Sequence, residues 1–167
     1  GTMVREKTKM EKMLISGVAA DKNVAKIRVA GLGNDPESTF HLLNLLDRNN
    51  LNIDVMIQSL GKDGTKSVSF TVAKPDMLRT IDVLNDNKDS LGIKKLDYDE
   101  NVAKISVIGA GVRSHSGVAA KMFGALANAG INTEMITTSE IRITALIDEA
   151  YADQAMRAIH ETFLERV

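Results

Sequence analysis

Two short polar loops, one in each half of the chain, carry residue types that could hold a small charged ligand. Residues 34–38 (Asn-Asp-Pro-Glu-Ser) and residues 113–117 (Arg-Ser-His-Ser-Gly) each stand between a predicted strand and a predicted helix. The first turn of a helix presents free backbone N–H groups and the positive end of the helix dipole, so it can hold a carboxylate. These loops therefore predict an anion-binding position at the start of each helix.

A second polar segment in each half contains a side chain that could receive the opposite charge. Asp54 lies in residues 52–58, and Glu134 lies at the matching place in residues 132–138. Either carboxylate could pair with an ammonium group, so a loop and its segment together could bind both ends of an amino acid. The alternative is that Asp35 and Ser116 are only helix caps and Asp54 only a solvated strand residue. The occurrence of the same arrangement in two copies favours the ligand site.

Sequence motifs for catalysis or nucleotide binding are incomplete. Residues 31–33 (Gly-Leu-Gly) and 109–111 (Gly-Ala-Gly) follow predicted strands, but neither continues to the third glycine of a dinucleotide-binding loop. Ser114, His115 and Ser116 could be imagined as a nucleophile and base, although three polar residues in a loop usually have no catalytic role. RNA-binding modules of similar architecture stack bases on aromatic strand residues, and only 4% of this chain is aromatic. We therefore predict no active site and no RNA-binding surface.

The composition excludes several other classes of function. The chain of 167 residues has a net charge of -1, so no basic field favours nucleic acid or an anionic membrane. It has no cysteine, and its three histidines are not spaced as a metal-binding pair, so we predict no metal site and no cofactor. No apolar run approaches the roughly 18 residues that a membrane helix needs. We predict a cytoplasmic protein whose residues 1–12 are a tag remnant or a lead-in, because Gly1-Thr2 precede Met3.

The chain contains an internal repeat. Residues 24–33 return as residues 102–111 at an offset of 78, and residues 52–59 return as residues 132–139 at an offset of 80. The hydrophobic patterns of each copy predict the order strand, helix, strand, strand, helix. Two copies of one unit favour a paired binding module, because matching clefts form where pseudo-symmetric units meet.

Local signals place the elements of both copies. The predicted strands are 25–30, 53–60, 67–73 and 93–98 in the first copy, and 102–108, 131–138 and 141–147 in the second. Asp35-Pro36 and Pro75-Asp76 start the helices of the first copy, and Ser116-Gly117 and Asp148 precede those of the second. The apolar faces predicted for the first-copy helices carry Phe40, Leu43 and Leu46, with Leu42 and Leu45 beside them, and then Leu78, Ile81 and Leu84. The apolar face predicted for the last helix carries Ala152, Ala155, Met156, Ile159 and Phe163. Asn50 and Gly130 tolerate the left-handed conformation that ends a helix, and residues 61–64 are a predicted turn.

The second copy ends without a fourth strand of its own. One apolar segment, residues 13–19, is left over ahead of the first copy. Because an unpaired sheet edge is a liability, we predict that this segment completes the sheet of the second unit. The first unit then comprises residues 24–98, and the second comprises residues 13–20 with 101–165. The predicted fold class is α+β, with two ferredoxin-like βαββαβ units, each a four-stranded antiparallel sheet with helices on one face.

Four strings of residues carry information beyond the fold class. The first half contains residues 15–22 (Ile-Ser-Gly-Val-Ala-Ala-Asp-Lys) and Asn52-Ile53-Asp54 with Gln58. The second half contains residues 107–118 (Val-Ile-Gly-Ala-Gly-Val-Arg-Ser-His-Ser-Gly-Val) and 136–143 (Ile-Thr-Thr-Ser-Glu-Ile-Arg-Ile). With these strings the chain resembles the C-terminal regulatory region of aspartate kinases, the tandem ACT domains that bind end-product amino acids. The resemblance covers residues 13–165, and that family has the same strand exchange.

The resemblance implies a regulatory role in a larger enzyme. The full enzyme phosphorylates the side-chain carboxylate of aspartate with ATP, and its catalytic domain would precede Gly1. This chain is then a regulatory fragment or subunit without catalysis of its own, and ATP and magnesium belong to the missing kinase domain. The implied partners are lysine and/or threonine as feedback effector, a second copy through the ACT units, and the catalytic domain or α subunit.

Effectors in that family lie between ACT units, in contact with the first loop, the helix start and the second strand. In the first unit the resemblance implies contacts at Asn34, Asp35, Pro36, Glu37, Ser38, Asn52, Ile53, Asp54 and Gln58. In the second unit it implies contacts at Ser114, His115, Gly117, Val118, Asn132, Thr133, Glu134 and Thr138. Family members often have Asp-x-Pro-Gly at the first loop, whereas Glu37 follows Pro36 here. The missing glycine changes how closely a carboxylate can approach the backbone.

The resemblance leaves alternatives open. The effector could be lysine, with its side-chain ammonium near Asp54 or Glu134, or threonine, hydrogen-bonded by groups such as Gln58, or both together. The ACT units could also hold kinase domains together without binding any ligand. A regulatory module of another amino-acid biosynthetic enzyme, with a different effector, is the third alternative.

Overall fold

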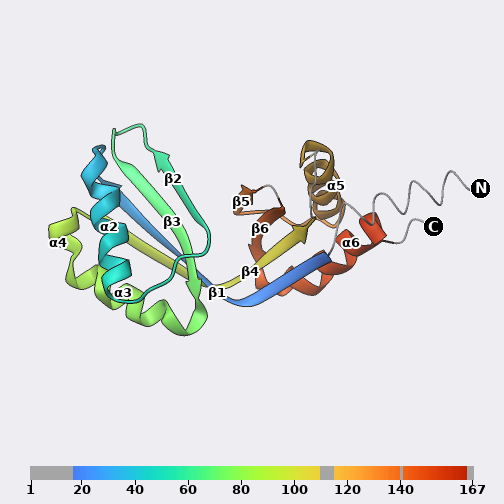
Figure 1. Cartoon of the computed structure of the whole chain (residues 1–167), viewed down its shortest axis with the longest axis horizontal. Coiled ribbons are helices and arrows are strands. Elements are labelled where there is room, and N and C mark those ends of the chain that lie inside the picture. Colours follow the sequence, from blue (N-terminus) through green and yellow to red (C-terminus); the bar gives the residue numbers. More distant parts are fainter. Residues whose placement is uncertain (1–16, 110–114, 140, 165–167) are drawn as a thin grey trace, which may run out of the picture. The chain divides into compact units, whose positions relative to one another are not determined.

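The structure is a computed structural model that describes residues 17–109, 115–139 and 141–164. Residues 13–16 of the predicted N-terminal strand and the loop residues Arg113 and Ser114 lie outside this part. The described chain divides into two compact units, one of residues 23–100 and one that joins residues 17–22 to the described residues after Glu100 (Figure 1).

The first unit has the element order βαββαβ. Its elements are the second part of β1 (Gly17–Leu32), α2 (Pro36–Arg48), β2 (Met56–Leu60), β3 (Lys66–Ala73), the 3-10 turn Lys74–Asp76, α3 (Met77–Asp86), the short α4 (Lys88–Leu91) and the first part of β4 (Lys95–Ile108). Its strands are ordered β2-β3-β1-β4, and β3 is antiparallel to both β1 and β2.

The second unit repeats the plan with strands taken from both ends of the chain. It contains the second part of β4, α5 (His115–Asn128), β5 (Met135–Thr138), β6 (Arg142–Asp148), the 3-10 turn Glu149–Tyr151 and α6 (Ala152–Leu164), together with the first residues of β1. Its strands are ordered β1-β4-β6-β5, and β6 is antiparallel to β4 and β5. The predicted α+β fold class with antiparallel sheets is therefore confirmed.

One prediction about the strands was wrong in detail. Residues 13–19 and 25–30 were expected as separate strands, as were 93–98 and 102–108, but β1 and β4 each run without interruption across the two units. The polar residues that suggest a break, 21–23 and 99–101, are mostly exposed. A strand tolerates such residues because its backbone can pair while the side chains remain in water.

The core of the first unit lies between its sheet and its helices. Alternate residues of β1 (Ala25, Ile27 and Val29) and of β3 (Val68, Phe70 and Val72) are buried. Their side chains form one cluster with Leu42, Leu46 and Leu84 of the helices. Helices therefore cover one face of this sheet, because alternate strand residues point to the same face.

Two residues of the predicted helix faces are exposed instead. Phe40 is 60% exposed and Leu78 is 68% exposed. On α2 the buried residues are Leu42, Leu45 and Leu46, and on α3 they are Met77, Thr80 and Leu84. These spacings of three and four define one stripe along each helix, and Phe40 and Leu78 fall outside it. Leu43 and Ile81 are half-buried.

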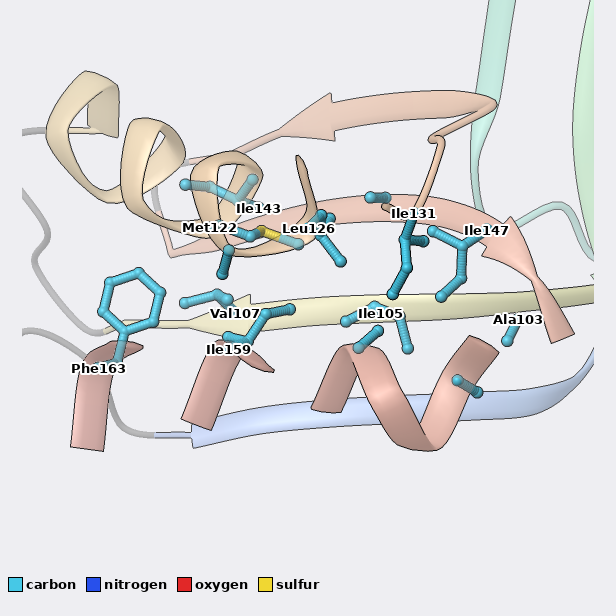
Figure 2. Packing of buried hydrophobic residues seen from close by; sticks show 14 residues of the cluster. Ala103, Ile105, Val107, Met122, Leu126, Ile131, Ile143, Ile147, Ile159 and Phe163 are labelled. Atoms are coloured by element: carbon cyan, nitrogen blue, oxygen red, sulfur yellow. The ribbon is translucent and has the colours of Figure 1, made fainter. Parts of the chain in front are cut away.

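The core of the second unit is drawn in Figure 2. Ile105 and Val107 of β4 and Ile143 and Ile147 of β6 face side chains from α5 and α6, including the fully buried Met122. Val18, in the first residues of β1, also packs against this cluster. The apolar face predicted for the last helix is present, since Ala152, Ala155, Ile159 and Phe163 are buried and Met156 packs partly buried against the same cluster.

The predicted helix ends and hairpin turn are confirmed by the backbone. Asn50 follows α2 with φ of 57°, and Gly130 follows α5 with φ of 72°. Among the described residues, Asn50 is the one non-glycine residue with a positive φ. Asparagine tolerates this left-handed conformation better than most residues. Gly64 has φ of 81° in the turn between β2 and β3.

Candidate effector site

The start of α2 is capped by the carboxylate of Asp35. Its Oδ1 accepts hydrogen bonds from the backbone N–H groups of Glu37 at 3.0 Å and Ser38 at 2.8 Å. The Ser38 hydroxyl donates to both carboxylate oxygens, at 3.1 Å and 2.9 Å. Hydrogen bonds from the Ser38 backbone and hydroxyl lower the pKa of Asp35, and the nearby Lys66 charge acts in the same direction. The first turn of α2 is therefore already satisfied by an internal anion.

This cap changes the charge that a ligand would meet. Two N–H groups that could hold a ligand carboxylate are bound to Asp35, which presents a negative charge in their place. Oδ2 accepts one hydrogen bond, from Ser38, so it has capacity to accept another. A ligand ammonium is consequently the charge that this carboxylate favours.

Gly33 allows Asp35 to take up this position. A Cβ atom on residue 33 would lie 2.5 Å from Oδ2 of Asp35 and 3.1 Å from the Ser38 hydroxyl. The first of these distances is far below a normal contact, so a larger residue would displace the carboxylate. The local sequence Gly33-Asn34-Asp35-Pro36 therefore places the cap, with Pro36 in the first turn of the helix.

Two neighbouring strands add polar groups at the same end of α2. The hydroxyl of Thr39 donates to Oε1 of Gln58 on β2 at 2.6 Å. On β3, Nζ of Lys66 donates to the backbone carbonyl of Asp35 at 3.1 Å. Lys66 is paired with Leu60, two residues from Gln58 on the same strand, so the side chains of Gln58 and Lys66 emerge on the same face. The start of α2 therefore has near it the carboxylate of Asp35, the ammonium of Lys66 and the hydroxyl groups of Ser38 and Thr39. These groups and Gln58 come from α2 with its cap, β2 and β3.

Thr39 and Lys66 were missed by the sequence reasoning. Thr39 lies one turn after the Asp35 cap, where a helical residue faces the same way as the cap. Lys66 follows the turn at residues 61–64, and the hairpin register places it diagonally across from Gln58. Both signals were present in the sequence, but a charged residue next to a turn is ordinarily a solvated one.

The Asn52-Ile53-Asp54 string lies at the opposite end of α2. The helix of 13 residues spans about 20 Å, and the string follows its C-terminus. The backbone N–H of Asp54 donates to the carbonyl of Thr71 at 3.1 Å, so the string joins β3 far from Lys66. Asn52 and Asp54 are exposed, whereas Ile53 packs partly against the core. Within one unit, the predicted contacts therefore form two separate groups.

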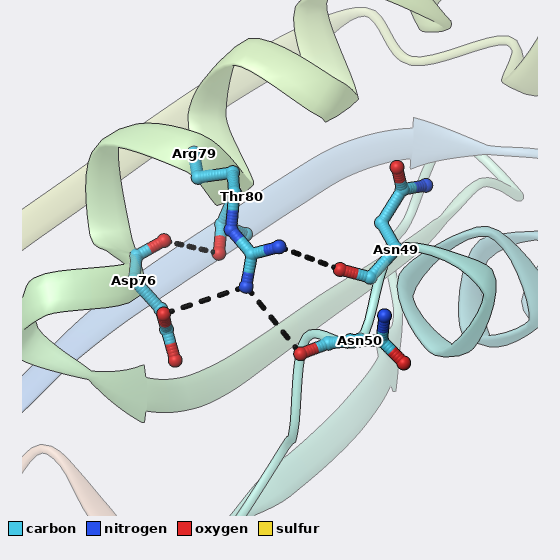
Figure 3. A network of polar contacts seen from close by, with 5 residues as sticks. All are labelled: Asn49, Asn50, Asp76, Arg79 and Thr80. Carbon is cyan, nitrogen blue, oxygen red and sulfur yellow. Dashed lines mark hydrogen bonds and ion pairs between the residues drawn. The ribbon is translucent and has the colours of Figure 1, made fainter.

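A guanidinium group holds the end of α2 that leads into this string, as Figure 3 shows. Arg79 of α3 donates to the backbone carbonyl of Asn49 at 2.8 Å and to that of Asn50 at 3.4 Å. The carboxylate of Asp76 lies 3.5 Å from the same guanidinium, and the Thr80 hydroxyl donates to the Asp76 carbonyl. The positive side chain thus satisfies carbonyl groups at the negative end of the helix.

The second unit divides its predicted contacts in the same way. Gly117 and Val118 are in the first turn of α5, whereas Asn132, Thr133 and Glu134 follow its C-terminus. A hollow of about 360 Å³ lies at this second position, lined by Phe123, Leu126, Ala127, Gly130, Ile131, Asn132 and Thr133. Thr138 is exposed on β5. Ser114 lies outside the described residues, and of His115 only the backbone at the start of α5 is described.

Comparison with known proteins identifies the family. Residues 105–163 match the model of the ACT domain family. The aspartokinase of Pseudomonas aeruginosa is 37% identical over 98% of this chain. A chain in the crystal structure of aspartokinase alpha and beta subunits is 42% identical with a TM-score of 0.83, and the alignment covers 89% of this chain and 98% of that one. The chain belongs to the aspartate kinase regulatory family.

A second structural relative agrees with this assignment. The ligand-free regulatory subunit of aspartate kinase from Thermus thermophilus is 33% identical, with a TM-score of 0.84, and the match covers 90% of this chain and 99% of that one. The regulatory chain described here spans about 40% of the length of the Pseudomonas relative. Its two units are ACT-type units, and the sequence resemblance is confirmed.

In this ACT regulatory chain the charges at the start of α2 suit a zwitterion. Asp35 supplies a negative oxygen, Lys66 supplies an ammonium, and Gln58 with Thr39 supplies neutral hydrogen-bonding groups.

No helix in the described part of the chain is long and apolar enough to cross a membrane.

Proposed function

We propose that this chain is an allosteric sensor that binds lysine and/or threonine and controls the activity of an aspartate kinase. The observation that carries the proposal is the pair of contacts at the start of α2, where Lys66 of β3 donates to the carbonyl of Asp35 and Thr39 donates to Gln58 of β2. A free amino acid requires an anion for its ammonium and a cation for its carboxylate, and these residues include both. The family to which the chain belongs supports a regulatory role.

We further propose that a second copy of the chain completes the site. The two groups of predicted contacts lie about 20 Å apart, at opposite ends of α2, so one small ligand cannot touch both within one unit. The strands β2 and β5 end the strand order and carry exposed apolar residues, among them Leu60 at 62% and Ile136 at 48% exposure. Such edges are suited to association with a second copy, which would bring the end of one helix to the start of another.

The kinase activity belongs to the rest of the enzyme in this proposal. A catalytic domain or α subunit phosphorylates the side-chain carboxylate of aspartate, and ATP and magnesium bind there. This chain contributes no catalytic group and transmits effector binding, because the effector binds one arrangement of the units more tightly than another. The crystal structure of aspartokinase alpha and beta subunits supports a partner of this kind.

Thermal unfolding tests the proposal. The purified chain is heated with lysine, threonine, methionine, isoleucine, valine or serine, each at about a hundred times a plausible dissociation constant. Binding to the folded state should add about 2.7 kcal/mol of stability, which is readily visible in a chain of this size. A shift with lysine or threonine alone supports the sensor and names its effector.

Two results would contradict the proposal. A shift with valine or serine in place of lysine and threonine would assign the chain to another biosynthetic enzyme. The absence of any shift, in the chain alone and together with its kinase partner, would favour a dimerisation module that binds no ligand. Sedimentation of the same samples measures whether a dimer forms independently of the amino acid.

A further inference from the structure

The two units differ in charge at one matched position, which is the first residue of β3 in the first unit and the residue just before β6 in the second. The strands β3 and β6 end at Ala73 and Asp148, which pair with the matched residues Val24 and Val102 of the repeat. Seven residues before these ends stand Lys66 in the first unit and Ile141 in the second. Ile141 is 54% exposed, so the second unit presents an apolar side chain where the first presents an ammonium.

The surroundings of Lys66 direct its charge to the start of α2. Its Nζ carries three N–H groups, and one of them donates to the backbone carbonyl of Asp35 at 3.1 Å. Its positive charge contributes to the lowered pKa of Asp35, so the two groups are electrostatically coupled. The carbonyl bond anchors the amine beside the cap, while the Asp35 carboxylate is held by Glu37 and Ser38.

The donors of the helix itself do not serve a ligand carboxylate at this position. The N–H groups of Glu37 and Ser38 both donate to Oδ1 of Asp35. An arriving carboxylate would have to compete with that internal anion and would be repelled by it. The amine of Lys66 is the cationic group that the structure holds beside the cap, through the backbone carbonyl of Asp35. The carboxylate of the same residue has Oδ2 as an acceptor for an ammonium.

We propose that Lys66 binds the α-carboxylate of the amino-acid effector while Asp35 binds its α-ammonium. The first unit thereby recognises the two charged groups that all α-amino acids share. This inference rests on the proposed sensor function and deepens it. The ammonium and the carboxylate of an amino acid are attached to the same carbon atom, so they suit a cation and an anion that lie at the same helix end. At the matched position the second unit has Ile141, whose side chain carries no charge that could bind the carboxylate.

The test compares each effector with its primary amide. Lysine and lysinamide, and likewise threonine and threoninamide, share the α-ammonium and the side chain, but the amide has no negative charge. Calorimetric titration of the wild-type chain should show tighter binding of the acid. Lys66→Met should weaken binding of the acid by roughly tenfold to a hundredfold, as expected for the loss of a hydrogen bond to a charged group, and leave the amide nearly unchanged.

Two variants separate recognition from structure. Lys66→Arg keeps a cation at the position and should retain most of the preference for the acid. Lys62→Met removes an exposed lysine from the turn before β3 and should change neither affinity. Circular dichroism and the Tm of each variant establish that it is folded before titration.

The outcomes are distinct. If Lys66→Met weakens acid and amide equally, or changes neither, Lys66 does not read the carboxylate and this inference is wrong while the sensor stands. If the wild-type chain, with and without its kinase partner, binds neither amino acid nor amide, the sensor function fails and this inference fails with it. A preference for the acid that disappears in Lys66→Met supports both.

Discussion

Replacing Arg79 by Gln gives the first unit the residue that the second unit has at the matched position. Arg79 follows the end of β3 by six residues, and Gln154 follows the end of the matched strand β6 by six residues. Gln154 donates one neutral hydrogen bond, from Nε2 to the carbonyl of Ala129 at 3.3 Å, where Arg79 donates to two carbonyls. The substitution therefore tests how much the guanidinium contributes beyond an amide.

The expected loss follows from the geometry in Figure 3. One hydrogen bond from Arg79 is short, at 2.8 Å, the other is long, at 3.4 Å, and the side chain is 51% exposed. A charge-assisted bond at such a half-exposed position contributes at the low end of its range, so Arg79→Gln should cost about 1 kcal/mol. For a chain of this length the Tm should fall by about 2–4 °C.

The loss should also be local. The segment after α2 is held by the N–H of Leu51, which donates to Leu46, and by the N–H of Asp54, which donates to Thr71. Hydrogen exchange of these two amides should quicken about fivefold, the factor that corresponds to 1 kcal/mol. Urea unfolding measures the global stability, and Arg157→Gln, at an exposed position on α6, is the control.

The reasoning would be refuted by an Arg79→Gln chain with wild-type stability and unchanged exchange at Leu51 and Asp54. A loss of stability equal to that of Arg157→Gln would likewise show that general charge, and not the carbonyl contacts, is responsible. If exchange quickens while amino-acid affinity is unchanged, the end of α2 is held by Arg79 but is not part of the effector site.

Three other perturbations have defined outcomes. Ile105→Ala, at a fully buried position, should cost about 2–5 kcal/mol in urea unfolding, and a cost below 1 kcal/mol would contradict the core assignment. Asn50→Val should cost about 1–2 kcal/mol, because a β-branched residue resists a φ of 57°, whereas Asn50→Gly should be nearly neutral; equal stabilities would contradict this account. The lowered pKa of Asp35 means that its cap contributes fully above its ordinary pKa near pH 4 and is lost as pH falls through the lower folded value. Asp35→Asn should flatten that part of the stability curve, and an unchanged acid slope would remove Asp35 as a contributor.

Local signals in the sequence were sufficient for most of the elements. Asp35-Pro36 starts a helix, and Asn50, Gly64 and Gly130 adopt positive φ, because each of these conformations depends on a residue and its immediate neighbours. The repeat offsets then predict the same plan in both units, and the antiparallel registers agree with it.

Features that depend on distant parts of the chain were harder to predict. Phe40 and Leu78 are exposed because tertiary packing selects which stripe of a helix is buried. The continuity of β1 and β4 depends on backbone pairing, which does not require apolar side chains. The polar residues 21–23 and 99–101 therefore suggest a break in the sequence pattern where the strands continue.

The candidate site also contains a contact between residues that are distant in sequence. Asp35 was predicted as a cap or a ligand contact, and the structure shows the cap, with both oxygens hydrogen-bonded within the loop and helix. Lys66 reaches this loop from a strand 31 residues away in sequence, so only the hairpin register could have indicated it. Which effector binds there stays a prediction.

The shared strands have a consequence for the order of synthesis. Residues 17–22 are made before the first unit, yet the unit to which they belong consists otherwise of residues after Glu100. Residues 23–100 form a continuous stretch, so the first unit can fold on the ribosome as soon as it has emerged. The opening residues of β1 must meanwhile wait, with their apolar Val18 uncovered, until the rest of the second core arrives. At about 5–20 residues per second this interval lasts several seconds, during which a chaperone or the partner chain could protect that segment.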